Sequence, residues 1–184
     1  FGTYLGGSGQ DISANVVVDK NNDLYFSGVT SSTDFLDGES TEYDGAYSNQ
    51  GGVQPYIVKL DNSGKLITYT HFPANGLIRH AYQRSTVMVT TDGNVILAGN
   101  DNSGNVPTSP GASQPTHGGG YDVFVAKLSS DLKSLKAATY LGGSGDEIDS
   151  EFTLDKSGNV YVTAMTSSDD FPVTKKAFDV TYNG

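Results

Sequence analysis

One stretch of this sequence occurs twice. The residues TYLGGSG occupy positions 3–9 and return letter for letter at positions 139–145. Three longer segments also align with one another without a gap: DLYFSGVTSSTDF (Asp23–Phe35), NVILAGNDNSGNV (Asn94–Val106) and NVYVTAMTSSDDF (Asn159–Phe171). Such self-similarity indicates a tandem repeat, in which each unit buries its apolar surface against the neighbouring units. The chain is therefore predicted to be a repeat array.

Each unit contains four short runs in which apolar and polar residues alternate. A period of two, with many β-branched and aromatic residues, predicts strands rather than helices. Asn, Asp and Gly fill connectors such as DKSGN (Asp155–Asn159), and these residues suit tight hairpins. We therefore expect four-stranded antiparallel meanders. The predicted strands of the two complete units are Asn15–Asp19, Leu24–Thr30, Tyr56–Asp61, Leu66–Phe72, Thr86–Thr90, Val95–Asp101, Val123–Ser129 and Leu135–Leu141.

Composition narrows the class of protein. Of the 184 residues only 17% are charged, while Gly numbers 23 and Tyr 11, which is typical of short strands joined by polar turns rather than of disorder. The net charge of −10 disfavours binding to nucleic acid. The absence of Cys excludes disulfides and thiol chemistry. No apolar run approaches the ~18 residues that a membrane span needs, so no membrane insertion is expected.

Several motifs together resemble a known repeat family. TYLGGSGDEID (Thr139–Asp149), LDKSGNVYVT (Leu154–Thr163), TSSDDFP (Thr166–Pro172) and YDVFVAKL (Tyr121–Leu128) are similar to the SBBP β-propeller repeat. The resemblance implies propeller blades, and an extracellular or cell-surface location in bacteria or archaea. It implies no catalytic residue. A β-solenoid or an extended array of sheets is the alternative architecture.

The phase of the repeat predicts the domain organisation. Residues 1–5 correspond to the end of a preceding blade, 6–73 and 74–141 to whole blades, and 142–184 to the first half of a third blade. Closed propellers need about four to eight blades. The fold class expected is therefore all-β, a partial β-propeller cut from a larger one. Its open strand edges are expected to pair with the rest of its own chain or with neighbouring copies.

The middle copy of the crossover departs from the pattern. HFPANGLIRHAYQR (His71–Arg84) stands where Gly-Gly-Ser-Gly is expected, and it holds both arginines and two of the three histidines. Insertions in repeat arrays map to loops on one face, which is often the binding face. Arg beside aromatic residues suits carboxylates, sulfates or sugar rings. The candidate ligand-binding residues are Arg79, His80, Tyr82 and Arg84.

A purely structural interpretation of this segment also stays open. The same residues can cap the loop and form local salt bridges with a neighbouring blade. His71 and His80 as metal ligands would need a third donor, which the sequence does not place. No metal site is therefore predicted here.

The glycine-rich motif itself has two interpretations. A phosphate cradle needs a helix N-terminus after the glycines, and no helical periodicity follows either copy. We therefore expect a sharp crossover between blades, which glycine permits. The Ser, Thr and Asp side chains of TSSTDF and TSSDDF are expected to fix a turn, with Phe35, Val106 and Phe171 beneath it as core.

Two acidic segments are candidates for calcium. GESTEYD (Gly38–Asp44) and GDEIDSE (Gly145–Glu151) carry clustered carboxylates, which calcium prefers as ligands. Neither matches an EF-hand loop or the calcium-binding nonapeptide of β-rolls. We expect solvated acidic loops and no cofactor, with calcium in these loops as the alternative.

No recurring set of catalytic residues is present. The sequence predicts a non-catalytic segment of a larger exported or cell-surface protein that presents loops to a protein or glycan partner. One alternative is a structural array or filament subunit that pairs through open strand edges. Another is a fragment of a polysaccharide-active enzyme, although a glycosidase needs two carboxylates about 5–10 Å apart and no recognisable pair occurs.

Overall fold

The computed structural model describes residues 1–36, 52–75 and 85–184. These ranges contain ten strands and no helix, hence no helix long and apolar enough to cross a membrane. The strands are β1 (Asp11–Val18), β2 (Leu24–Thr30), β3 (Gln54–Leu60), β4 (Leu66–His71), β5 (Thr86–Val89), β6 (Val95–Asp101), β7 (Asp122–Leu128), β8 (Leu135–Leu141), β9 (Glu147–Leu154) and β10 (Val160–Thr166). The predicted all-β class is confirmed.

The strands form three antiparallel sheets whose order follows the chain. Strands β1–β4 form a four-stranded sheet, β5–β8 form a second, and β9 pairs with β10 alone. We call these sheets blades 1, 2 and 3. Within each sheet, every strand pairs with the strand next to it in the sequence, so the predicted meander is confirmed.

Strand β1 begins earlier than its sequence pattern predicts. It starts at Asp11 rather than Asn15, and its pairing with β2 shifts between Ser13 and Asn15. Such a bulge adds a residue to one strand and so breaks the alternation of inward and outward side chains. The pattern therefore reveals only the half of the strand that follows the bulge.

The hairpin turns repeat one set of hydrogen bonds. The Oδ1 atoms of Asp19, Asp61 and Asp155 each accept the backbone N–H groups two and four residues further on, at 2.8–3.0 Å. Gly64 and Gly158, near the ends of two of these turns, have φ values of 89° and 82°. An L-residue with a side chain rarely adopts that conformation. The predicted turn chemistry is confirmed.

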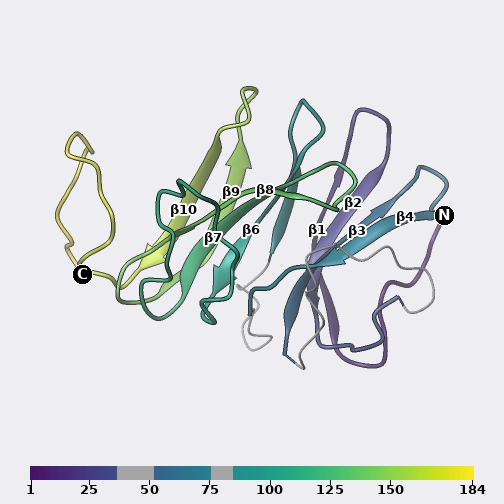
Figure 1. Ribbon diagram of the computed structural model, residues 1–184, viewed down its shortest axis with the longest axis horizontal. Coiled ribbons are helices and arrows are strands. Elements are labelled where there is room, and N and C mark those ends of the chain that lie inside the picture. The colour runs from purple at the N-terminus through teal and green to yellow at the C-terminus, as the bar shows by residue number, and fades with distance from the viewer. Residues whose placement is uncertain (37–51, 76–84) are drawn as a thin grey trace.

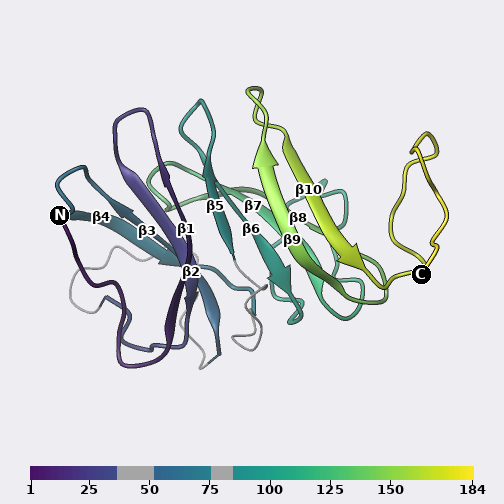
Figure 2. The ribbon, with the colours of Figure 1, turned by 180° about the vertical axis from the view of Figure 1, so that it is seen from behind.

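The three sheets stand side by side in chain order along the longest axis of the molecule (Figure 1). The same order is seen from behind, with blade 1 at one end and blade 3 towards the other (Figure 2). Strand β5 contacts both β1 and β9, so the first strands of the three blades are neighbours. This stacking of meander sheets is the arrangement of a partial propeller.

The apolar cores lie between the sheets and on the outer side of blade 1. Tyr25 and Ile57 of blade 1 form one core with Leu97 and Phe124 of blade 2, and the rings of Phe72 and Phe124 stack at 5.4 Å. A second core between blades 2 and 3 contains Met88, Ile96 and Ala98, against which Phe152, Leu154 and Val160 pack. A third cluster covers the outer face of blade 1: Phe35, Tyr56, Val58, Leu60 and Tyr69, with Phe26 packed against it.

The predicted core positions after the serine motif differ in burial. Phe35 and Val106 are buried, as predicted. Phe171 is only partly buried. The reason is that blade 3 has only β9 and β10 among the described residues, whereas in blade 1 the rings of Tyr56 on β3 and Tyr69 on β4 lie against Phe35.

Polar side chains also join the blades. The Asn15 amide donates to the Val87 carbonyl and accepts the Val87 N–H, both at 2.9 Å. The Ser27 hydroxyl donates to Asn15 Oδ1 at 2.6 Å and lies 2.7 Å from the Ser85 carbonyl. Blade 1 thus satisfies the main chain at the start of β5, which would otherwise be buried without partners.

Candidate functional site

The ligand-binding residues predicted from the sequence lie outside the described residues. Arg79, His80, Tyr82 and Arg84 fall in 76–84, and the acidic segment Gly38–Asp44 falls in 37–51. Their assignment stays a prediction. His71 is described, and it ends β4 as a buried residue. Its ring lies edge-on to Phe35 at 5.6 Å and to Tyr69 at 5.9 Å, so His71 belongs to the aromatic packing of blade 1.

The glycine-rich crossover binds the serine motif of its own blade. In blade 3 the N–H of Ser144 donates to Asp170, and the next two N–H groups donate to Ser168 and Ser167, all at 2.8 Å. In blade 1 the N–H groups of residues 8, 9 and 10 make the same bonds to Asp34, Ser32 and Ser31, at 2.7–2.9 Å. We call this set of hydrogen bonds the crossover lock.

The crossover lock explains why both motifs recur. The backbone N–H groups that a phosphate cradle would use already have side-chain acceptors. The predicted turn-fixing role is also present, since the Thr30 and Thr166 hydroxyls accept the N–H of Ser32 and Ser168 at 2.9 and 3.0 Å. The pairing of the glycine-rich motif with the serine motif was not predicted from the sequence. The signal for this pairing was that a serine motif follows both complete copies of the glycine-rich motif.

The acidic crossover of blade 3 is not uniformly solvated, and that expectation was wrong for Glu147. Its side chain is fully buried. One carboxylate oxygen accepts the Gly143 N–H at 2.9 Å, and the other accepts the hydroxyls of Thr166 and Ser168 at 2.5 and 2.7 Å. Asp11 makes the corresponding bonds in blade 1. A buried carboxylate with this many donors completes the crossover lock.

The other acids of this segment do not converge on one point. Asp146 and Glu151 are exposed, as expected, and Asp149 lies in the bulge of β9 with φ 52°. Over the ranges 1–36, 52–75 and 85–184, no group of three or more His, Asp or Glu residues is placed to hold a metal ion.

A second buried carboxylate faces Glu147. Asp122 begins β7, is fully buried, and accepts the Gly118 N–H at 2.6 Å and the Gln114 amide at 3.2 Å through Oδ2. Its Oδ1 has no hydrogen-bond partner among the residues that the structure describes. A Cβ atom at Gly142 would lie 2.4 Å from Asp122 Oδ1 and 2.5 Å from Glu147 Oε2. Because glycine has no such atom, the two carboxyl groups can meet across the crossover.

The environment of Asp122 favours its protonated form. Burial raises the pKa of Asp122, and the negative charges of Glu147 and Asp101 act in the same direction, against the Gly118 N–H and His117. Gln54 holds the corresponding place in blade 1. Asp122 opens the recurrent segment DVFVAKL, but no residue pattern around it predicted a buried carboxyl group.

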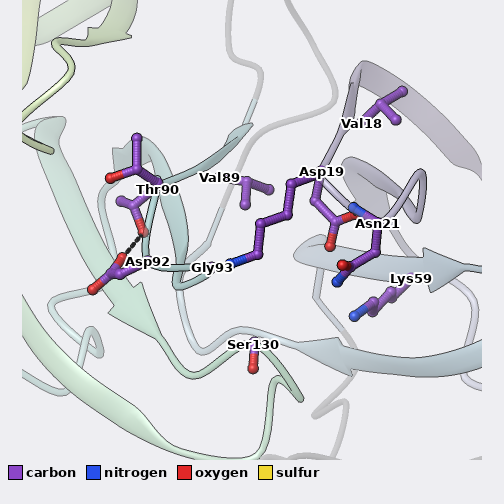
Figure 3. Close-up of a pocket in the computed structure, with 11 residues that line it drawn as sticks. Val18, Asp19, Asn21, Lys59, Val89, Thr90, Asp92, Gly93 and Ser130 are labelled. Atoms are coloured by element: carbon purple, nitrogen blue, oxygen red, sulfur yellow. Dashed lines mark hydrogen bonds between the residues drawn. The ribbon is translucent and has the colours of Figure 1, made fainter.

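A cavity of about 390 Å³ lies where the hairpin turns of blades 1 and 2 meet (Figure 3). Residues 18–21 of the β1–β2 turn and residues 89–93 of the β5–β6 turn supply most of its wall. Lys59 of β3 and Ser130 of the β7–β8 turn complete it. Side chains from both blades are therefore needed to build the cavity.

The cavity wall carries both signs of charge. Lys59 lies 3.1 Å from Asp23 and 4.9 Å from the centre of the Tyr25 ring, and Lys20 adds a second ammonium group. The Thr90 hydroxyl donates to Asp92, which holds the pKa of Asp92 below its usual range. Asp92 is thus ionised at neutral pH, where it accepts hydrogen bonds and is a poor proton donor. Such a wall can hold a polar, hydroxyl-rich group.

Comparison with known protein families supports the assignment that the fold indicates. Residues 138–172 match the family model of the SBBP beta-propeller repeat. No curated protein matches the chain. The matched segment runs from β8 through the glycine-rich crossover, β9 and β10 to the serine motif, so it contains both halves of the crossover lock. Residues 138–172 are therefore similar to the SBBP beta-propeller repeat, and they belong to a stack of two four-stranded antiparallel sheets and one two-stranded sheet.

Proposed function

We propose that this chain is a non-catalytic segment of a larger exported or cell-surface protein, and that it presents turns and loops of its propeller blades to a glycan or protein partner. The observation that carries the proposal is the cavity between the turns of blades 1 and 2 (Figure 3). Blade architecture fixes those turns next to one another on a rigid support, which is how repeat proteins build binding surfaces.

The chemistry of the cavity favours a glycan. Sugar hydroxyls both donate and accept hydrogen bonds, and the wall offers acceptors at Asp19 and Asp92 and donors at Lys20 and Asn21. The segment with Arg79, His80, Tyr82 and Arg84, predicted from the sequence alone, is a second candidate for binding, and its residue types suit acidic sugars. The net charge of −10 disfavours nucleic acid as the partner.

The protonation and burial of the carboxyl groups support a binding role rather than a catalytic one. Glycoside hydrolysis needs an acid with a raised pKa that can reach the glycosidic oxygen. In the described ranges, Asp92 lines the cavity with a lowered pKa, while Glu147 and Asp122 lie buried inside the crossover. The proposed role needs no cofactor, so binding should survive treatment with EDTA.

A glycan array followed by calorimetry on the best ligand tests this proposal. Replacing Lys20 and Asp92 together by Ala should weaken binding about tenfold or more, because each supplies hydrogen bonds from one side of the cavity. An Arg79→Ala, Arg84→Ala chain tests the second surface. Lys175→Ala with Lys176→Ala, after β10 and outside the cavity wall, is the control for lost charge and should bind like the unaltered chain.

Three results would overturn the proposal. The first is binding that neither double substitution affects. The second is a chain with no affinity for any glycan or extracellular protein tested. The third is release of new reducing ends from a polysaccharide by the purified chain, which would make it an enzyme.

A further inference from the structure

Most lysines of this chain lie at one end of the blades. Successive strands of a meander run in opposite directions, so the five tight turns, at residues 19–23, 61–65, 90–94, 129–134 and 155–159, share that end. The β1–β2, β5–β6 and β9–β10 turns lie along the top of Figure 1. We call the five turns and the lysines beside them the turn face. It contains seven of the nine lysines: Lys20, Lys59, Lys65, Lys127, Lys133, Lys136 and Lys156.

The turns of adjacent blades lie close enough to form one surface. The β1–β2, β5–β6 and β7–β8 turns together line the cavity between blades 1 and 2 (Figure 3). A Cβ atom at Gly158 in the β9–β10 turn would lie 3.8 Å from Thr90 Cγ2 at the β5–β6 turn, so blade 3 continues the row. A ligand longer than one sugar can therefore contact the turns of successive blades.

The charged groups of the turn face differ in how they are partnered. Its aspartates accept hydrogen bonds from their own turns or pair with a lysine: Asp19, Asp23, Asp61, Asp92, Asp131 and Asp155. Its exposed lysines make no ion pair within the part of the chain that the structure describes: Lys20, Lys65, Lys133, Lys136 and Lys156. The turn face thus offers ammonium groups without a counter-charge, beside carboxylates that keep spare acceptor lone pairs.

Much of the negative charge lies at the other end of the strands. Asp11, Asp122 and Glu147 begin strands at that end, and Asp101 ends one. A strand of seven residues is about 23 Å long, whereas salt screens charges beyond about 8 Å at physiological ionic strength. The field at the turn face is therefore set by its own lysines and aspartates rather than by the net charge of −10.

We propose that the turn face binds a linear acidic polysaccharide, with sugar carboxylates on the exposed lysines and sugar hydroxyls on the aspartates. This inference rests on the proposed function and names its ligand class. A uronic acid brings one carboxylate and several hydroxyls, so it suits a surface on which ammonium and carboxylate groups alternate. The phosphates of a nucleic acid duplex carry denser charge and bring no hydrogen-bond donor for the aspartates, which repel them.

Calorimetry of the full chain with polygalacturonate and with its methyl ester tests the proposal. The ester keeps the sugar backbone and removes the charge. The acid form should bind at least about tenfold more tightly at low salt, and its affinity should fall as the salt concentration rises. Binding of the ester should depend little on salt.

A variant outside the cavity wall separates this inference from binding in the cavity alone. Lys133→Gln, Lys136→Gln and Lys156→Gln, combined in one chain, remove three exposed charges of the turn face. This chain should lose about tenfold in affinity for polygalacturonate and bind the ester unchanged. Lys175→Gln with Lys176→Gln, after β10, is the control and should bind both polymers like the unaltered chain. Circular dichroism checks the fold of each variant.

Equal affinity for the acid and its ester would overturn this inference and leave the proposed glycan-binding role standing. The same holds if the chain binds a neutral glycan but not polygalacturonate, or if the triple variant binds polygalacturonate unchanged. Duplex DNA bound as tightly as polygalacturonate would also overturn it, because it would indicate attraction to any polyanion. A chain that binds no glycan at all would overturn both proposals.

Discussion

Strands β2 and β10 occupy the same position in blades 1 and 3, yet their surroundings differ. Their sequences, LYFSGVT and VYVTAMT, follow the same pattern. Tyr25 of β2 is 0% exposed, whereas Tyr161 of β10 is 56% exposed. The difference arises because blade 2 covers β2, while no sheet in the described part of the chain covers the corresponding face of β10. Burial in this protein is therefore a property of the neighbouring blade rather than of the strand.

Strand β6, in contrast to β10, is buried along its whole length. All seven of its residues are buried, because blade 2 has a neighbour on each side. Blade 3 covers only part of blade 2, and a cavity of about 330 Å³ remains beside it, lined by Ile96, Val125 and Ala137 among others. The crossover lock, in contrast, has the same hydrogen bonds in blades 1 and 3. It is local to each blade and does not depend on a neighbour.

The largest effect expected from this comparison comes from removing the two equivalent tyrosines. Tyr25→Ala should lower the free energy of unfolding by about 3–5 kcal/mol, because it empties a space between two packed sheets. Tyr161→Ala should change it by only about 0.5 kcal/mol, since the ring is already half in solvent. Urea denaturation followed by circular dichroism measures both values at a concentration where the chain is monomeric.

Equal losses in the two variants would contradict the comparison. They would mean that the tyrosine stabilises each blade from within, independently of its neighbour. Tyr161→Phe serves as the control for the loss of the hydroxyl alone.

A smaller effect is expected from the polar bridge between blades 1 and 2. Asn15→Ala removes the side-chain donor to the Val87 C=O and leaves the Val87 N–H with only its longer bond to the Ser27 hydroxyl at 3.1 Å, so it should cost about 1–3 kcal/mol. Glu151 holds the same place in β9 and is exposed, so Glu151→Ala should cost about 0.5 kcal/mol or less. Hydrogen exchange at the Val87 amide should quicken in the first variant alone. Unchanged exchange there would show that Asn15 does not hold the two blades together.

The smallest effect concerns pH and the pair of buried acids. Burial raises the pKa of Asp122 in the folded chain, with Glu147, Asp101 and His117 as its charged neighbours. Its stabilising contribution is thus complete below the pKa of an unfolded aspartate, about 4, and is lost as the pH rises through the folded pKa. Asp122→Asn imitates the protonated acid at every pH. Relative to the unaltered chain, it should therefore gain about 1 kcal/mol of stability between pH 4 and pH 8.

Asp131→Asn provides a control of opposite sign. The Ser129 hydroxyl lowers the pKa of Asp131, so its contribution is present above the unfolded pKa and disappears as the pH falls through the folded pKa. That variant should lose stability relative to the unaltered chain as the pH rises. Urea midpoints measured across this pH range distinguish the two slopes. Parallel pH profiles for both variants would contradict the role given to Asp122.

Much of the fold was predictable from residue patterns. The strands from Leu24 to Thr30 and from Val95 to Asp101 have the predicted bounds, because alternation and turn residues act over a few neighbours in the chain. The start of β1 was missed because a bulge interrupts the alternation. The burial of Glu147 was missed because its hydroxyl partners, Thr166 and Ser168, are distant in sequence. The cavity between the turns was also unpredictable, since it needs the placement of one blade against another.

The repeat, the strands, the tight turns and the motifs that form the crossover lock can all be identified in the residue pattern. These features follow from backbone preference, side-chain periodicity and short hydrogen-bonded turns. The packing of one blade against another sets which copy of a repeated residue is buried and which carboxylates share the interior. The physical reason is that burial and dielectric environment depend on every atom nearby, and most of those atoms belong to another blade.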